Sequence, residues 1–203
     1  MKNSTKSLFA FAGLAGMMLL SSCTEKQNIA GLWQGNPTRL ELAGAANAMA
    51  TTTLNFAPNS DARSGNMNIS STIEIEQALP GSAENSFVDP FAASIAATAS
   101  VNATYTFKEG EDDDILVNIT PHSLNVVVDP DGVTFDRKIL TGMMQSQVDS
   151  LSESVAAQMK AAITSAIQQE YAKYQQIEDI KVHHGDMMSC EIADRDQTFR
   201  KVD

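Results

Sequence analysis

A stretch of strict two-residue alternation constrains the fold of this chain more than any other feature. From Ser94 to Phe107, apolar side chains occupy every odd position starting at Ile95, and the even positions from Thr98 to Thr106 carry only threonine, serine or asparagine. A period of two places alternate residues on opposite faces of a β-strand, whereas a helix would scatter them around its axis. The pattern therefore predicts a long strand with one buried face and one solvated face.

Shorter segments of the same period lie on both sides of this strand. Leu54 and Phe56 alternate with polar residues, and the odd positions from Met67 to Ile75 are apolar except for Ser71. Further alternating segments occupy residues 115–119, 124–128, 180–182, 188–192 and 198–202. We predict loops at 39–50 and 79–91, with a short helix at 40–49 as an alternative, and turns at 120–123 and 129–132. Proline and glycine mark the second loop and the second turn.

The period changes to three or four residues between Thr141 and Ile177. Apolar side chains recur at these spacings at Met144, Val148, Leu151, Val155, Met159, Ile163, Ile167, Tyr171 and Tyr174. The pattern predicts one long amphipathic helix, or two in tandem, whose apolar face packs on the sheet. A continuous helix would reach about 50 Å. That length exceeds the width of a small barrel, so a break or an overhanging end is expected.

Successive antiparallel strands need their edges paired or covered, and closure into a barrel removes those edges. We therefore predict a mainly β fold, an antiparallel barrel of about eight strands. One long helix, at about residues 141–177, is inserted before the final hairpin. A chain of 203 residues suits a single domain, which we place at residues 29–203.

The N-terminal segment has the pattern of a secretory signal. Lys2 and Lys6 precede an uninterrupted apolar run from Leu8 to Leu20, and the segment contains no acidic residue. A basic start followed by an apolar stretch too short to span a bilayer is typical of signal peptides. We predict that residues 1–22 are removed, which leaves a mature net charge of −13 from the −11 of the whole chain. Such an acidic protein is a poor partner for nucleic acid.

The sequence at the end of this segment resembles the lipobox of bacterial lipoproteins. Leu20 is followed by two serines and then by Cys23, directly behind the apolar run. The resemblance implies that Cys23 is the first mature residue and carries the acyl chains, with residues 23–28 forming the lipidated cysteine and a short tether. It implies a membrane partner through this anchor, in the bacterial cell envelope and at the outer membrane. Cys190 would then lack a disulfide partner, and its alternating surroundings predict a small buried side chain.

The first strand resembles the opening strand of lipocalins. Gly31, Leu32 and Trp33 match the G-x-W pattern of that family, in which the tryptophan closes one end of an eight-stranded barrel. The resemblance implies structural roles for Gly31 and Trp33 and a basic residue over the indole. Arg200 is the first candidate for that cation and Arg195 the second. The position of the helix before the final hairpin departs from the usual lipocalin order.

A barrel of this kind predicts a binding protein for a small hydrophobic or amphipathic ligand, because an eight-stranded barrel has just enough interior for one. The expected ligand-binding residues are Trp33, Leu54, Phe56, Ile73, Ile75, Val101, Tyr105, Phe107, Met144 and Met159. The small inward residues Ala97, Ala99 and Ala103 leave space for a ligand or for the helix. The alternative is therefore an envelope interaction or scaffold protein with a filled barrel and no ligand.

Catalysis and metal binding have no supporting pattern in the sequence. No nucleophile elbow, zinc-binding helix motif, phosphate loop or dinucleotide fingerprint occurs, and the histidines lie in or beside turns. The acidic tract Glu111–Asp114 and the segment Asp129–Gly132 do not fit a calcium-loop template. We predict a non-enzymatic protein with no cofactor and no metal, and the identity of any protein partner stays open.

Overall fold

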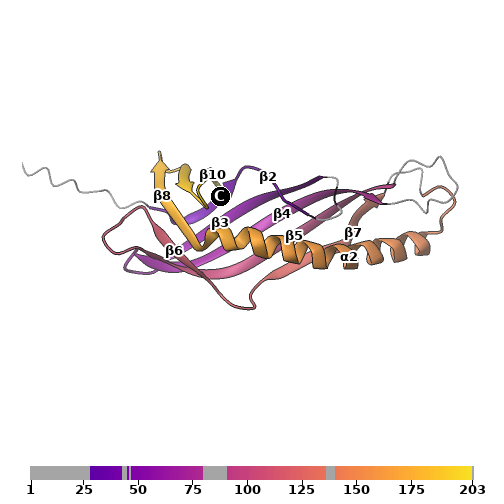
Figure 1. The fold of residues 1–203 in the computed structure, drawn as a ribbon, viewed down its shortest axis with the longest axis horizontal. Helices are drawn as coiled ribbons and strands as arrows, with labels where there is room; N and C mark the ends of the chain where they lie inside the picture. The colour runs from indigo at the N-terminus through magenta and orange to yellow at the C-terminus, as the bar shows by residue number, and fades with distance from the viewer. Residues whose placement is uncertain (1–27, 43–44, 46, 80–90, 136–139, 203) are drawn as a thin grey trace, which may run out of the picture.

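The computed structural model describes residues 28–42, 45, 47–79, 91–135 and 140–202 (Figure 1). The predicted signal peptide, Cys23 and residues 24–27 lie outside this range. The strands are β1 (Gly31–Gly35), β2 (Thr38–Arg39), β3 (Asn47–Pro58), β4 (Ser64–Leu79), β5 (Phe91–Phe107), β6 (Ile115–Ile119), β7 (Asn125–Phe135), β8 (Gln176–His183), β9 (Met187–Glu191) and β10 (Asp196–Val202). The helices are α2 (Gln145–Ala172) and the short 3-10 helix η1 (Lys173–Gln175).

Eight of these strands form a closed antiparallel barrel, as the sequence predicts. Around the barrel the order is β1, β10, β9, β8, β6, β5, β4 and β3, and β3 pairs with β1 to close the ring. β2 pairs with the start of β3, and β7 pairs with β5 outside this ring. Closure leaves the eight barrel strands paired on both sides, which removes most of the exposed sheet edges.

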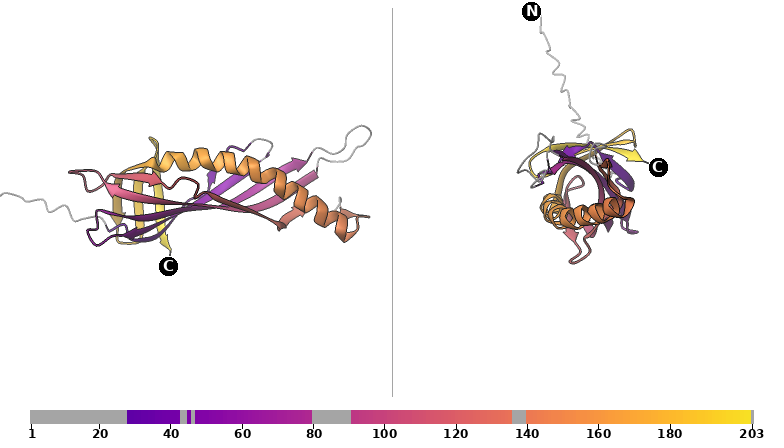
Figure 2. Two further views of the ribbon diagram at one scale, coloured as in Figure 1. Left: turned by 90° about the horizontal axis from the view of Figure 1, so that it is seen from below. Right: turned by 90° about the vertical axis from the view of Figure 1, so that its right-hand side faces the viewer.

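The long strands β3, β4 and β5 carry the sheet beyond the barrel. The second half of β5 pairs with β6 inside the ring, whereas its first half pairs with β7. The structure is therefore a barrel at one end and an open, curved sheet at the other. In Figure 2 the helix runs along this sheet, and the end-on view shows the strands curving around it.

The predicted long strand is confirmed as β5. Every odd residue from Ala93 to Phe107 is buried, and the even residues beside them face outward, exposed or partly exposed. β5 pairs along its whole length with β4. The alternation that dominates the sequence thus belongs to the central strand of the sheet, whose inner face lines the core.

The predicted helix is a single continuous element, shorter at both ends than residues 141–177. It begins after Met144, whose backbone N–H donates to Oε1 of Gln147 at 2.9 Å, and β8 already starts at Gln176. The helix spans 28 residues, about 42 Å at the usual rise. The helix has no break: it lies along the extended sheet and packs on β7, and its first turns, residues 145–150, are mostly exposed, which agrees with the alternative of an overhanging end. No helix in the described part of the chain combines the length and apolar character of a membrane span.

Two local expectations need correction. The segment predicted as a loop at 39–50 contains β2 and the start of β3, which pair as a hairpin through Thr38 and Ala50. Asp129–Gly132 turns as predicted, yet the chain stays in β7. Val128 pairs with Ala97 of β5, and pairing resumes at Val133, which is opposite Ile95. The proline and glycine therefore make a bulge within a strand and not a turn between strands.

A buried hydroxyl network joins the end of the helix to the sheet. The Tyr171 hydroxyl lies 3.1 Å from both the Ala99 carbonyl, to which it donates, and Oγ of Ser71. Ser71 is in turn 3.0 Å from Oγ1 of Thr52. Burial raises the pKa of Tyr171 to about 12, so the phenol is neutral and available as a donor across the physiological range. Each buried hydroxyl of this network has a partner, as a dry interior requires.

Candidate functional site

Trp33 closes the end of the barrel at which the described chain begins. Its side chain is fully buried, and its indole N–H donates to the Ile29 carbonyl at 2.8 Å. The ammonium of Lys201 lies 5.4 Å from the ring centre. Gly31 is close to this cation: it has a φ of +113°, and a Cβ there would lie 3.0 Å from Cε of Lys201.

The cation over the indole is Lys201 and not Arg200, the residue expected from the lipocalin pattern. Lys201 lies opposite Trp33 in the register of β1 and β10, and it shares the inner parity of β10 with Phe199. Arg200 takes the outer parity and is exposed, and Arg195 lies in the turn before β10. The reason for the difference is the strict alternation of side chains along a strand.

Most of the residues predicted to line a ligand cup meet in one apolar cluster inside the barrel and the sheet. These are Trp33, Leu54, Phe56, Ile73, Ile75, Val101, Tyr105, Phe107 and Met159. Met144 lies apart from them, at the start of the helix, with 67% of its surface exposed. The sequence pattern thus identified an interior cluster, and the first turn of the helix lies outside it.

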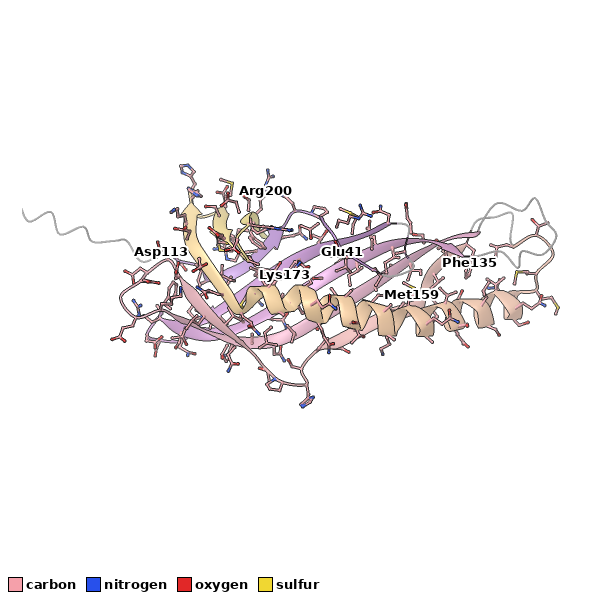
Figure 3. All side chains as sticks on the ribbon, viewed as in Figure 1. Glu41, Asp113, Phe135, Met159, Lys173 and Arg200 are labelled. Atoms are coloured by element: carbon pink, nitrogen blue, oxygen red, sulfur yellow. The ribbon has the colours of Figure 1, made fainter. Side chains whose placement is uncertain are left out.

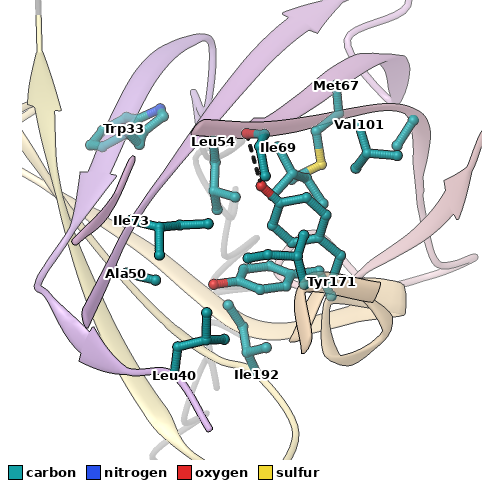
Figure 4. Packing of buried hydrophobic residues seen from close by; sticks show 14 of the residues in the cluster. Trp33, Leu40, Ala50, Leu54, Met67, Ile69, Ile73, Val101, Tyr171 and Ile192 are labelled. Atoms are coloured by element: carbon teal, nitrogen blue, oxygen red, sulfur yellow. Dashed lines mark hydrogen bonds between the residues drawn. The ribbon is translucent and has the colours of Figure 1, made fainter. Parts of the chain in front are cut away.

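Side chains of the sheet and the helix fill the interior around these residues. Leu54, Ile73 and Ile75 have 0% exposed surface, so no space of the size of a water molecule adjoins them. From the helix, Val155, Met159, Ile163, Ile167 and Tyr171 are buried against the sheet; Figure 4 shows Tyr171 among Leu54, Ile69 and Ile73. The helix thus occupies the volume that the small residues of β5 leave free.

Tyr105 fills the interior near the hairpin that joins β3 to β4. Its ring makes edge contacts with Phe56 and Phe107, at centroid distances of 5.4 and 6.3 Å. Gly65 is required beneath it, since a Cβ there would lie 2.8 Å from the ring. The hydroxyl is buried without a hydrogen-bond partner among the described residues. Burial, with the nearby Asp61 carboxylate, raises the pKa of Tyr105.

The acidic tract Glu111–Asp114 is tied to basic side chains at the barrel end of the molecule, where Figure 3 labels Asp113. Nζ of Lys108 lies 2.9 Å from Asp114 and 3.3 Å from Glu178. Arg63 donates to Asp112 at 2.7 Å and to the carbonyls of Lys108 and Glu111. These contacts hold the loop between β5 and β6 against the neighbouring hairpin. Within the described chain, no group of His, Cys, Asp or Glu side chains could hold a metal ion.

Cys190 lies inside the core, as its alternating neighbours predict. Only 3% of its surface is exposed. Burial raises the pKa of its thiol to about 12, so the nucleophilic thiolate is scarce at neutral pH. The side chain packs as a small apolar group.

Two adjoining hollows open beside β2, outside the filled interior. The larger, of about 540 Å³, is lined by Leu40, Leu42, Ala45 and Ala48 together with Arg39, Glu41 and Asn47. The smaller, of about 180 Å³, lies between β2, the end of the helix and the turn from β9 to β10, and its lining includes Arg39, Lys173, Tyr174, Ile192 and Arg195. Arg39 belongs to both. Lys173, at this end of the helix, is labelled in Figure 3.

A third hollow lies on the outer face of β3, β4 and β5. It has about 380 Å³ and is lined mainly by uncharged amides and hydroxyls, among them Asn55, Asn66, Asn68, Asn102 and Thr104. The Asn68 side chain donates to Oδ1 of Asn102 at 3.0 Å. The lining also includes Ala57, Met67 and Ala103, and none of its described residues is charged.

The protein is a closed antiparallel barrel with an inserted helix, and its two adjoining hollows lie beside the edge strand β2. Comparison of the chain with protein-family models, with curated proteins and with solved structures found no match.

Sequence reasoning did not find the hollows beside β2. Arg39, Lys173 and Arg195 lie far apart in the chain and belong to no motif. They meet only because the barrel closes β10 next to β1 and the helix ends beside β2. The chain has 14 basic and 25 acidic residues. This excess of acidic residues makes a cluster of basic side chains unexpected, but it does not say which of them meet.

Proposed function

We propose that this protein is a lipid-anchored protein of the bacterial cell envelope that binds a small amphipathic molecule. The proposed site is the pair of hollows beside β2, and not the interior of the barrel. The observation that carries the proposal is that a hollow with leucine and alanine side chains in its lining and a hollow with three basic side chains in its lining share one residue, Arg39. A molecule with an apolar part and a polar head would match both.

The size and lining of the larger hollow support this proposal. Ligand sites in proteins usually occupy about 300–1,000 Å³ and combine an apolar lining with a few polar groups. The hollow of about 540 Å³ lies within this range. Its apolar contacts come from the partly exposed Leu42 and Ala45, since Leu40 and Ala48 are buried in the core, and Arg39, Glu41 and Asn47 make the rest of the lining polar. No catalytic role is proposed, because binding alone accounts for this arrangement.

The filled interior favours a second candidate function. Leu54, Ile73 and Ile163 have no exposed surface, so a ligand could enter the interior only by displacing packed side chains. If the hollows beside β2 are also without a ligand, the protein is best explained as a rigid envelope scaffold that contacts another protein. Binding of an apolar dye separates these two functions.

The first experiment measures binding of Nile red, a neutral dye that fluoresces in apolar surroundings. We expect saturable binding to the mature chain from residue 23 carrying Cys23→Ala, a background without the acyl chains and without the apolar run Leu8–Leu20, both of which would take up the dye. Ala45→Phe fills the larger hollow and is expected to weaken binding about tenfold or more, or about 1.4 kcal/mol. Ala57→Phe is the matched control, since Ala57 lies on β3, the strand that follows Ala45, but lines the third hollow.

The outcomes of the dye titration are distinct. Loss of binding in Ala57→Phe but not in Ala45→Phe would move the site to the outer face of the sheet. Unchanged binding in both variants would return the ligand to the barrel interior. The absence of saturable binding to the parent chain would favour the scaffold function.

The second experiment tests the anchor. Cys23→Ala is expected to shift the protein from the membrane fraction to the soluble fraction, because two or three acyl chains exceed what stable anchoring needs, at about 0.8 kcal/mol per buried methylene. The measurement is fractionation after a high-salt wash, followed by mass spectrometry of the mature N-terminus. Ser22→Ala, which keeps a small residue before the cysteine, is the control. Retention of the Cys23→Ala variant in washed membranes would contradict the lipid anchor.

A further inference from the structure

We infer that the ligand of the hollows beside β2 is an anionic amphiphile, whose carboxylate or phosphate head binds between Arg39, Lys173 and Arg195. This inference rests on the proposed function and assigns the chemical class of its ligand. The apolar chain would lie in the larger hollow, and the head would lie in the smaller one, with Arg39 at the junction.

Positive charge is scarce in this chain but concentrated at the smaller hollow. Three of the nine lysines and arginines that the structure describes line a space of about 180 Å³, with Glu170 as the one carboxylate in the lining. The strands just beyond it present the opposite charge, in a row across β8, β9 and β10 made of Glu178, Glu191 and Asp196. The cations are therefore a local feature and not the general character of this side of the molecule.

Two of these cations have no counter-ion among the residues that the structure describes. Lys173 pairs with Glu170, three residues earlier on the helix. Among the described residues, neither Arg39 nor Arg195 makes an ion pair with a carboxylate. Like charges that share a hollow repel one another, and a bound anion would remove that repulsion. The site thus has an unbalanced positive charge that an anionic head would neutralise.

The geometry of the side chains suits an oxyanion. Guanidinium groups present planar forks of N–H donors that match carboxylate and phosphate oxygens. Thr38 and Gln197 also line the hollow and add uncharged polar groups. The arginines are exposed, and exposed ion pairs contribute little by themselves. Useful affinity therefore requires the apolar chain as well as the charged head.

The experiment is displacement of Nile red by three amphiphiles with the same chain, each below its micellar concentration. Myristate and myristyl phosphate are expected to displace the dye at concentrations about tenfold or more lower than neutral monomyristoylglycerol. Inorganic phosphate, which has the head but no chain, is expected to leave the dye bound. Arg195→Gln should weaken displacement by the two anions about tenfold and leave the neutral compound unchanged.

Two further variants test whether the charge at the smaller hollow controls the binding of the anions. Glu170→Gln frees Lys173 from its partner, so it is expected to strengthen binding of the anions. Arg200→Gln is the matched control, because Arg200 is exposed on β10 but lines neither hollow. Equal displacement by all three amphiphiles, with no effect of Arg195→Gln, would overturn the anionic assignment and leave the proposed binding function intact. Displacement by inorganic phosphate would also overturn it, whereas the absence of dye binding would instead remove the proposed function.

Discussion

Val101→Asp is expected to destabilise the protein by about 3–5 kcal/mol, because it places an unpaired carboxylate in a dry interior. Val101 lies in the middle of β5, has 3% of its surface exposed and faces Ile69 across the strand pair. A domain of this size is stable by about 5–15 kcal/mol. The substitution would therefore remove a large share of the stability, or unfold the chain.

The control for this prediction is the next residue. Asn102→Asp places the same carboxylate on the outer face, where Asn102 is exposed and its Oδ1 accepts a hydrogen bond from Asn68 that an aspartate can also accept. Its expected effect is within about 0.5 kcal/mol. Urea unfolding followed by the fluorescence of Trp33, the only tryptophan, measures both. Equal midpoints for the two variants would contradict the burial of alternate residues on β5.

The strands were predictable because their signal is local. The long strands of this fold have one face in the core, so apolar and polar residues alternate along the sequence, as β5 shows from Ala93 to Phe107. Closure of the sheet into a barrel was also predictable, since it pairs the two edge strands that an open antiparallel sheet would leave exposed. The bulge at Asp129–Gly132 was not, because proline and glycine signal a change of direction without saying whether pairing resumes.

The position of the helix depends on information that is not local. Its apolar spacing identified the residues from Val155 to Tyr171 that are buried, but Val148 and Leu151 are only partly buried and Ser152 is buried in the same stretch. Which turns of a helix meet the sheet depends on how far the strands extend beyond the barrel. The cluster of Arg39, Lys173 and Arg195 depends even more on the tertiary structure, because these residues come from β2, from the end of the helix and from the turn before β10.

Ile163→Ala is expected to cost about 2–5 kcal/mol of unfolding free energy, because it removes packed methylene groups and leaves a cavity. Ile163 has no exposed surface and lies on the helix between Met159 and Ile167, which are also buried. If the helix were a mobile lid over an empty cup, its apolar face would have space beside it and the loss would be small. The size of the effect therefore tells a filled interior from a cup.

The measurement compares urea unfolding of Ile163→Ala with that of Gln168→Ala, an exposed position on the same helix. The control is expected to change stability by no more than about 0.5 kcal/mol. Because the hollows beside β2 are separate from this part of the core, Nile red binding should be the same in both variants. A loss below about 1 kcal/mol in Ile163→Ala, together with increased dye uptake, would place the ligand under the helix and reverse the assignment of the site.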